Sequence, residues 1–224
     1  MLPLRDVIPS RTTPYVTVTI IILNALAWFY EVSMPREQLS VFLQLFGVVP
    51  AAFSAPTLLT SMFLHGSWSH VIGNMWYLWI FGDNVEDRLG HGRFVVFYLL
   101  CGTVAAFGQI LIDPQSTLPT IGASGAIAGV MGAYFVLYPQ SRVLTLVTLI
   151  IFWEIIELPA IMLLGFWFLM QLFSAGAIAV TASTGGAGSG GVAFMAHVAG
   201  FVFGGVSMLV LRRQPTRPWE DSAY

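Results

Sequence analysis

Charged residues are scarce in this sequence, and lysine is missing altogether. Only 9% of the 224 residues are charged, and the nine positive charges are all arginines. A soluble domain carries roughly 25% charged residues. Hydrophobic residues make up 57% of the chain, and its mean hydropathy is +0.80. These proportions exclude a water-soluble domain for most of the chain and predict a membrane protein.

The chain also has few groups that could cross-link it, bind a metal or bind nucleic acid. Cys101 is the one cysteine, so an internal disulfide is excluded. The four histidines lack carboxylate or cysteine companions at ligand spacing, so we expect no metal and no cofactor. The net charge of −2 says nothing about nucleic acid, but no basic patch with interleaved aromatics occurs, so we expect no nucleic-acid partner.

Apolar runs are what the sequence has in abundance. A helix needs about 20 mainly apolar residues to span a bilayer. Six segments approach that length, at residues 14–30, 68–81, 93–112, 124–138, 159–177 and 192–211. They predict an all-α polytopic membrane protein with six transmembrane helices and the lipid bilayer as its surroundings.

The arginines indicate how these six segments are oriented. With the N-terminus inside, eight of the nine arginines fall on the inner side and only Arg36 falls outside. Such an excess of positive charge is typical of cytoplasmic loops. We therefore expect a multi-pass protein of a bacterial plasma membrane with both termini in the cytoplasm. The predicted parts are a cytoplasmic segment at 1–13, a transmembrane domain at 14–213 and a cytoplasmic tail at 214–224.

Three segments that connect the predicted spans have compositions that predict structure of their own. The segment at 142–158 is as apolar as a span, but Glu154 and Glu157 near its end predict a re-entrant or interfacial piece on the cytoplasmic side. The outer loop at 31–67 is long, and we expect it to contain short helices. The glycine-rich stretch at 181–191 predicts a flexible flap beside the last span.

Two polar residues stand inside apolar segments. Ser124 lies between Gly122 and Gly125 at the head of the fourth segment, and His197 lies in the sixth. Polar side chains are costly in hydrocarbon, so they are functional candidates by default. A serine and a histidine together predict a nucleophile and its general base.

Both residues are predicted to lie at the same depth. From Ser124 to Pro139, where the fourth segment leaves the bilayer, there are 15 steps, and from His197 to Arg212 there are again 15. At the rise of an α-helix each stretch covers about 22 Å. The two side chains are therefore expected at one level, in the outer part of the hydrocarbon core.

Glycines on the same two segments predict that their helices come close together. Gly125 lies next to Ser124, and Gly200 and Gly204 follow His197 at helical spacing. Small residues four apart let helix backbones approach in lipid. Close approach is what a hydrogen bond between the serine and the histidine requires.

Two further side chains are candidates for binding an oxyanion. His70 and Asn74 are four residues apart, so they share one face of the second segment. The N–H of Ser124 lies in the first turn of its helix and lacks an intrahelical partner. These three donors predict an oxyanion hole. Because no carboxylate occurs in a span at that depth, we expect a Ser–His dyad in which packing orients His197.

At this point the sequence resembles the rhomboid family of intramembrane serine proteases over roughly residues 14–213. The resemblance rests on four motifs in order: His65–Gly–Ser–Trp–Ser–His70–Val–Ile–Gly–Asn74, Glu86–Asp–Arg88–Leu–Gly90, Gly122–Ala–Ser124–Gly125 and Ala196–His197–Val–Ala–Gly200–Phe–Val–Phe–Gly204. It implies a six-helix bundle whose fourth helix is short and central. It also implies Ser124 as nucleophile, His197 as base, and cleavage of single-span transmembrane proteins near or within their membrane helix.

The resemblance is incomplete in two places. Some members place a tyrosine against the base one turn after the serine, where this chain has Ala128, and some carry a Trp–Arg pair where it has residues 55–58. His65 is five residues from His70, and that offset predicts that it points elsewhere. The aromatic fifth segment is a candidate lateral gate. The alternatives are an inactive relative that binds membrane clients and a small transporter.

Overall fold

The computed structural model describes residues 1–149, 152–183 and 193–211, and most of these are helical. The long helices are α1 (Tyr15–Ser33), α4 (Trp68–Leu89), α5 (His91–Ile112), α6 (Ser124–Leu137), α7 (Ala160–Ser183) and α8 (Phe194–Leu211). The expected short helices of the outer loop are α2 (Arg36–Phe46), η1 (Pro50–Ala52), α3 (Thr57–Thr60) and η2 (Ser61–Phe63). Most of the predicted flap, and the predicted tail at 214–224, lie outside the described residues.

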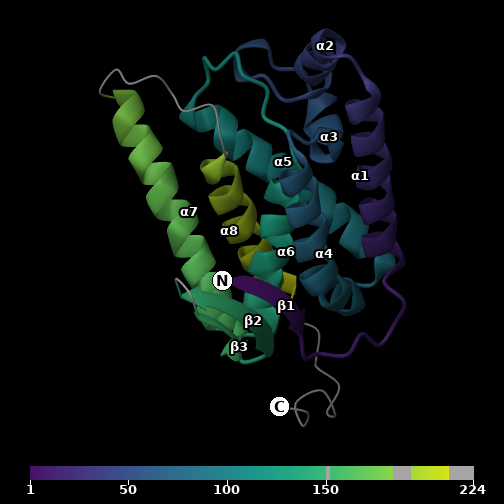
Figure 1. Cartoon of the computed structure of the whole chain (residues 1–224), viewed down its shortest axis with the longest axis vertical. Helices are drawn as coiled ribbons and strands as arrows, with labels where there is room; N and C mark the ends of the chain where they lie inside the picture. The colour runs from purple at the N-terminus through teal and green to yellow at the C-terminus, as the bar shows by residue number, and fades with distance from the viewer. Residues whose placement is uncertain (150–151, 184–192, 212–224) are drawn as a thin grey trace.

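A three-stranded antiparallel sheet at one end of the bundle corrects the all-α prediction (Figure 1). The segment predicted to be re-entrant or interfacial contributes two antiparallel strands, β2 (Arg142–Leu149) and β3 (Phe152–Pro159). β1 (Leu2–Asp6), from the segment predicted to be separate at 1–13, pairs with β2. A short apolar run does not reveal by periodicity whether it is strand or helix, and this one is rich in the β-branched residues that strands favour.

Large hydrophobic side chains cover the outward faces of the helices. Leu26, Ile72, Val96, Phe173 and Val206, one from each of α1, α4, α5, α7 and α8, are all more than half exposed. Soluble monomers rarely expose so much contiguous apolar surface. Among the described residues, α1 and α5 are long and apolar enough to cross a membrane by length and composition, while α6 and parts of α7 and α8 are shorter apolar helices. The six-helix membrane arrangement stays a prediction.

Helix α6 lies at the centre of the bundle. Every residue from Gly125 to Tyr134 is buried, and α6 packs against α4, α5 and α8. In Figure 1, α8 stands between α6 and α7, and α7 stands at the edge of the bundle. Because neighbouring helices surround α6, they fix the position of its first residue, Ser124.

The C-terminal end of α6 is tied to the sheet by hydrogen bonds. Tyr134 donates its hydroxyl hydrogen to Asp6 Oδ2 at 2.7 Å, and the side chain of Asn84 donates to the same oxygen at 2.8 Å. Burial is the main cause that raises the pKa of Asp6, to about 7, and the charge of Asp83 adds to it. β1 therefore anchors α6 at the end opposite to Ser124.

Candidate active site

The loop that leads into α6 is held on both sides, so Ser124 has a defined position. Thr120 and Val48 exchange two backbone hydrogen bonds, of 2.8 and 3.0 Å. Gly122 donates its N–H to the carbonyl of Ser61 at 2.9 Å. The φ angle of Gly122 is +124°, a backbone conformation that favours glycine. α6 then begins at Ser124.

The two side chains that the sequence pairs lie in hydrogen-bond contact. Ser124 Oγ is 2.8 Å from His197 Nε2, and His197 is 8% exposed. Their helices meet backbone to backbone, because a Cβ added at Gly200 would lie 2.1 Å from the carbonyl oxygen of Gly125. At Gly204 the corresponding distance, to the oxygen of Gly129, is 1.9 Å. Any side chain at Gly200 or Gly204 would push the serine and the histidine apart.

His70 approaches Ser124 across Gly122. A Cβ added at Gly122 would lie 2.8 Å from His70 Nε2 and 3.6 Å from Ser124 Oγ, so both atoms border the same small space. The N–H of Gly66 donates to His70 Nδ1 at 3.4 Å. A ring nitrogen that accepts a hydrogen bond leaves the proton on the other nitrogen. Nε2 of His70 is therefore the donor, and it lies on the Ser124 side.

Asn74 is buried one turn after His70, and its contact was not anticipated. Asn74 Nδ2 lies 3.0 Å from His65 Nε2. Among the described residues, no hydrogen bond joins Asn74 to Ser124 or His197. The predicted oxyanion donors therefore divide into His70, which borders the serine, and Asn74, whose amide contacts His65.

The five-residue offset predicted that His65 points away from the site. That prediction is wrong, because the ring lies beside His70. Its ring centroid is 5.0 Å from that of His70. The helical offset does not apply, because α4 begins only at Trp68. Both carboxylate oxygens of buried Glu31 accept from the His65 N–H at 3.2 Å. Burial and the neighbouring His70 lower the pKa of His65 to about 4, so this imidazole is neutral at physiological pH.

The prediction that packing alone orients His197 is incomplete. His197 Nδ1 lies 2.8 Å from Gln171 Oε1 on α7. The ring of Trp167, one helical turn before Gln171, has its centroid 5.9 Å from that of His197, with 37° between the planes. Sequence reasoning missed Gln171, although a polar amide in an apolar segment is the same signal that singled out Ser124 and His197.

Glu86, from the second of the four motifs, lies two residues after Asn84, at the end of the bundle that carries the sheet. Its carboxylate accepts from the backbone of Val16 and Thr17 at 2.9 and 2.8 Å, at the start of α1. It also contacts His91 Nδ1 at 2.6 Å. Residues 1–149, 152–183 and 193–211 contain no group of three or more His, Cys, Asp or Glu side chains that could hold a metal ion.

Comparison with known proteins decides the family. Residues 51–214 match the Rhomboid domain, which is most of the chain. The chain belongs to the rhomboid family. Rhomboid proteins of similar sequence include the Rhomboid protease GluP of Bacillus subtilis (strain 168), which is 36% identical over 92 residues, or 41% of this chain and 18% of the relative.

Two plant rhomboid relatives match a longer stretch. Rhomboid-like protein 11, chloroplastic, of Arabidopsis thaliana is 29% identical over 164 residues, covering 70% of this chain and 52% of the relative. RHOMBOID-like protein 6, mitochondrial, of the same plant is 30% identical over 164 residues, covering 73% and 46%. The chain thus spans about half the length of these relatives, or less.

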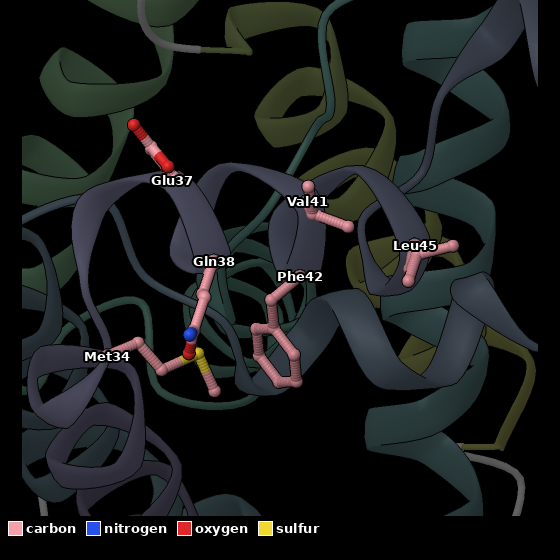
Figure 2. A pocket seen from close by; sticks show the side chains of 6 residues that line it. All are labelled: Met34, Glu37, Gln38, Val41, Phe42 and Leu45. Atoms are coloured by element: carbon pink, nitrogen blue, oxygen red, sulfur yellow. The ribbon is translucent and has the colours of Figure 1, made fainter.

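The rhomboid match contains Ser124, His197 and the side chains around them on α4 and α7, whereas a surface groove lies outside it. The groove, of about 450 Å³, is formed by the end of α1 and by α2, and its lining residues are Met34, Glu37, Gln38, Val41, Phe42 and Leu45. Figure 2 shows Met34, Gln38 and Phe42 extending to the same side of the helix. None of these six residues belongs to the candidate active site.

Proposed function

We propose that this rhomboid protein is an intramembrane serine endopeptidase. It hydrolyses peptide bonds in or near the transmembrane segment of single-span membrane proteins. The observation that carries the proposal is the 2.8 Å contact between Ser124 Oγ and His197 Nε2 inside an apolar bundle. A nucleophile within hydrogen-bond reach of its base is the arrangement that covalent catalysis requires. The similarity to a relative named as a protease supports the same conclusion.

The chemistry is acyl transfer through Ser124. Its Oγ forms a bond to the carbonyl carbon of the scissile peptide, while His197 Nε2 takes the hydroxyl proton. The negative charge that develops on the carbonyl oxygen is stabilised by the Ser124 N–H and by His70 Nε2–H. The Asn74 amide, which contacts His65 through Nδ2, has a second Nδ2 hydrogen that it can donate to the same oxygen. The C–N bond then breaks, and the imidazolium donates its proton to the leaving amine. Water hydrolyses the acyl-enzyme ester by the same steps and restores the free serine.

The proposed membrane arrangement uses α1, α4, α5, α6, α7 and α8 as six spans, with α6 short and central. Exposed apolar side chains on the outer faces of α1, α4, α5, α7 and α8 would contact lipid. The sheet, together with most of the arginines, lies at the inner end, which favours cytoplasmic termini and, for a bacterial protein, the plasma membrane. Ser124 begins α6 and therefore lies at the outer side of the buried helix.

A substrate helix must unwind before it can react. Inside a helix the scissile carbonyl already accepts a hydrogen bond, and lipid offers no replacement. Glycine weakens a helix by about 1 kcal/mol relative to alanine, so helices with glycine near the cut are the expected substrates. Because α7 stands at the edge of the bundle, it is the proposed route of lateral entry.

The direct test uses the purified protein in detergent micelles with a tagged single-span substrate whose membrane helix contains glycines. Wild type should give two fragments. Ser124→Ala and His197→Ala should each lower the rate at least about a thousandfold, because the two side chains act as one unit. Gel analysis of fragments measures the rates, and thermal melting checks that the variants are folded.

A fluorophosphonate probe separates this proposal from the alternative of an inactive client-binding protein. The active enzyme should be labelled, and Ser124→Ala should not. A wild type that is neither labelled nor able to cut, yet still binds the substrate, would overturn the proteolytic function in favour of client binding.

A further inference from the structure

The fifth span of the proposed bundle carries an amide that contacts the candidate base. Gln171 of α7 lies among outward-facing apolar residues: Met170 and Leu172 beside it are each nearly half exposed. A polar amide without a partner is costly in an apolar environment. Gln171 has a partner, because its Oε1 lies 2.8 Å from His197 Nδ1.

The same face of α7 supplies a second contact to the imidazole. Trp167 and Gln171 are four residues apart, so they project from one face of the helix. The Trp167 ring lies 5.9 Å from the His197 ring, centroid to centroid, and the neighbouring Phe168 stacks on Phe201 of α8 at 4.7 Å. α7 therefore holds the histidine ring on the side opposite to Ser124. On α6, the residue one turn after Ser124 is Ala128, which has no ring to place against the histidine.

We propose that Gln171 is a positioning residue that sets the tautomer of His197. Its Oε1 accepts the Nδ1–H, which leaves the lone pair of Nε2 free to take the proton of Ser124. The two contacts to His197 are therefore linked, since a proton on Nδ1 is what makes Nε2 a base. This role rests on the proposed function of the Ser–His pair.

A glutamine fits this position for an electrostatic reason. A carboxylate would hold the histidine in the same way, but an ionised group at this depth carries a large desolvation cost. A neutral amide accepts the same hydrogen bond without that cost. The orientation of the base then depends on α7 remaining packed against α8.

Three variants test this role. Gln171→Met keeps the approximate length and removes the acceptor, whereas Gln171→Glu keeps an acceptor. Leu172→Met introduces the same side chain on the outward face and serves as the control. We expect Gln171→Met to lower both kcat and the rate of fluorophosphonate labelling about tenfold, the size of one neutral hydrogen bond, with KM unchanged. For Gln171→Glu both rates should stay within about threefold of wild type. For Leu172→Met both rates should equal those of wild type.

The imidazole spectrum gives a readout that does not depend on activity. The chain has four histidines, so ¹⁵N-histidine labelling gives few signals, and His197→Ala identifies the one of interest. Wild type should show His197 protonated on Nδ1, and Gln171→Met should shift the proton partly to Nε2.

Two results would overturn the role of Gln171. One is wild-type His197 protonated on Nε2, a measurement that needs no variant to fold. The other is Gln171→Met labelling at the wild-type rate. If wild type and Ser124→Ala both fail to react with the probe, the proposed function fails instead, and the spectrum still decides the role of Gln171.

Discussion

Two of the neighbours of helix α8, α6 and α7, hold it in different ways. Towards α6 the contact is backbone against backbone, with no room for a Cβ at Gly200 or Gly204. Towards α7 the contact is made by side chains, such as Phe168 on Phe201 and Gln171 on His197. The outward residues of α7 include Phe173, which is 72% exposed. The serine and the histidine thus share a rigid interface, whereas the group that orients the histidine comes across an adaptable one.

This difference has a physical basis in what each contact can tolerate. Backbone atoms at van der Waals contact cannot yield, so the α6–α8 distance has one value. Aromatic and amide side chains can change rotamer, so α7 can shift by a small amount and keep part of its contact. The proposed entry of a substrate helix beside α7 would use this difference.

The largest expected effect comes from filling the rigid interface. Gly204→Ala would place a Cβ 1.9 Å from the carbonyl oxygen of Gly129. The helices must separate, at a cost of about 3 kcal/mol, and the melting temperature should fall by about 10 °C. Proteolysis should be lost as well, because Ser124 and His197 move apart.

Gly176→Ala on α7 is the matched control. A Cβ there meets nothing within 4 Å, so the same substitution should leave activity unchanged and stabilise the helix by about 0.5–1 kcal/mol. Thermal melting in micelles measures both variants. Equal effects of the two substitutions would contradict the distinction between the interfaces.

A middle-sized effect is expected from the adaptable interface. Phe168→Ala removes the ring that stacks on Phe201 at 4.7 Å. We expect a loss of about 1–2 kcal/mol in stability, but labelling by fluorophosphonate within about threefold of wild type, because Gln171 remains. Phe166→Ala is the control and should cost less, because Phe166 is 52% exposed. A loss as large as that of Gly204→Ala would show that α7 is as rigid as α6.

The smallest effect concerns the C-terminal end of α6, where Tyr134 donates to Asp6. Burial raises the pKa of Asp6 from 3.8 to about 7. Between these values the folded chain binds a proton that the unfolded chain has released, so this group's contribution to stability falls as the pH rises from about 4 to about 7. Asp6→Asn should flatten that decline and raise the melting temperature at pH 8 by about 2 °C.

The control for this titration is Asp113→Asn, at an exposed loop position. It should leave the pH dependence of the melting temperature as in wild type. His65 contributes with the opposite sign, because burial lowers its pKa to about 4 and acid then favours the unfolded chain. A decline with pH that survives Asp6→Asn would assign it to another group.

Much of the candidate site could be anticipated from residue spacing. Equal helical distances from the inner end placed Ser124 and His197 at one depth, and glycines at helical spacing predicted a close α6–α8 contact. Both inferences concern positions along a single helix, and the rise per residue fixes these. Conformations outside helices could not be anticipated in this way, as the ring of His65 shows, because helical spacing has no meaning before α4 begins.

The sequence by itself determined the apolar helices, the polar residues among them and the relative depth of those residues, because hydropathy and helix geometry are local properties. Only the tertiary structure decided that residues 142–149 and 152–159 form strands, that Asn74 contacts His65 and that Gln171 contacts His197. Those outcomes depend on which element packs beside which. That choice is set by the fit of side chains from distant parts of the chain, and spacing along one segment does not encode it.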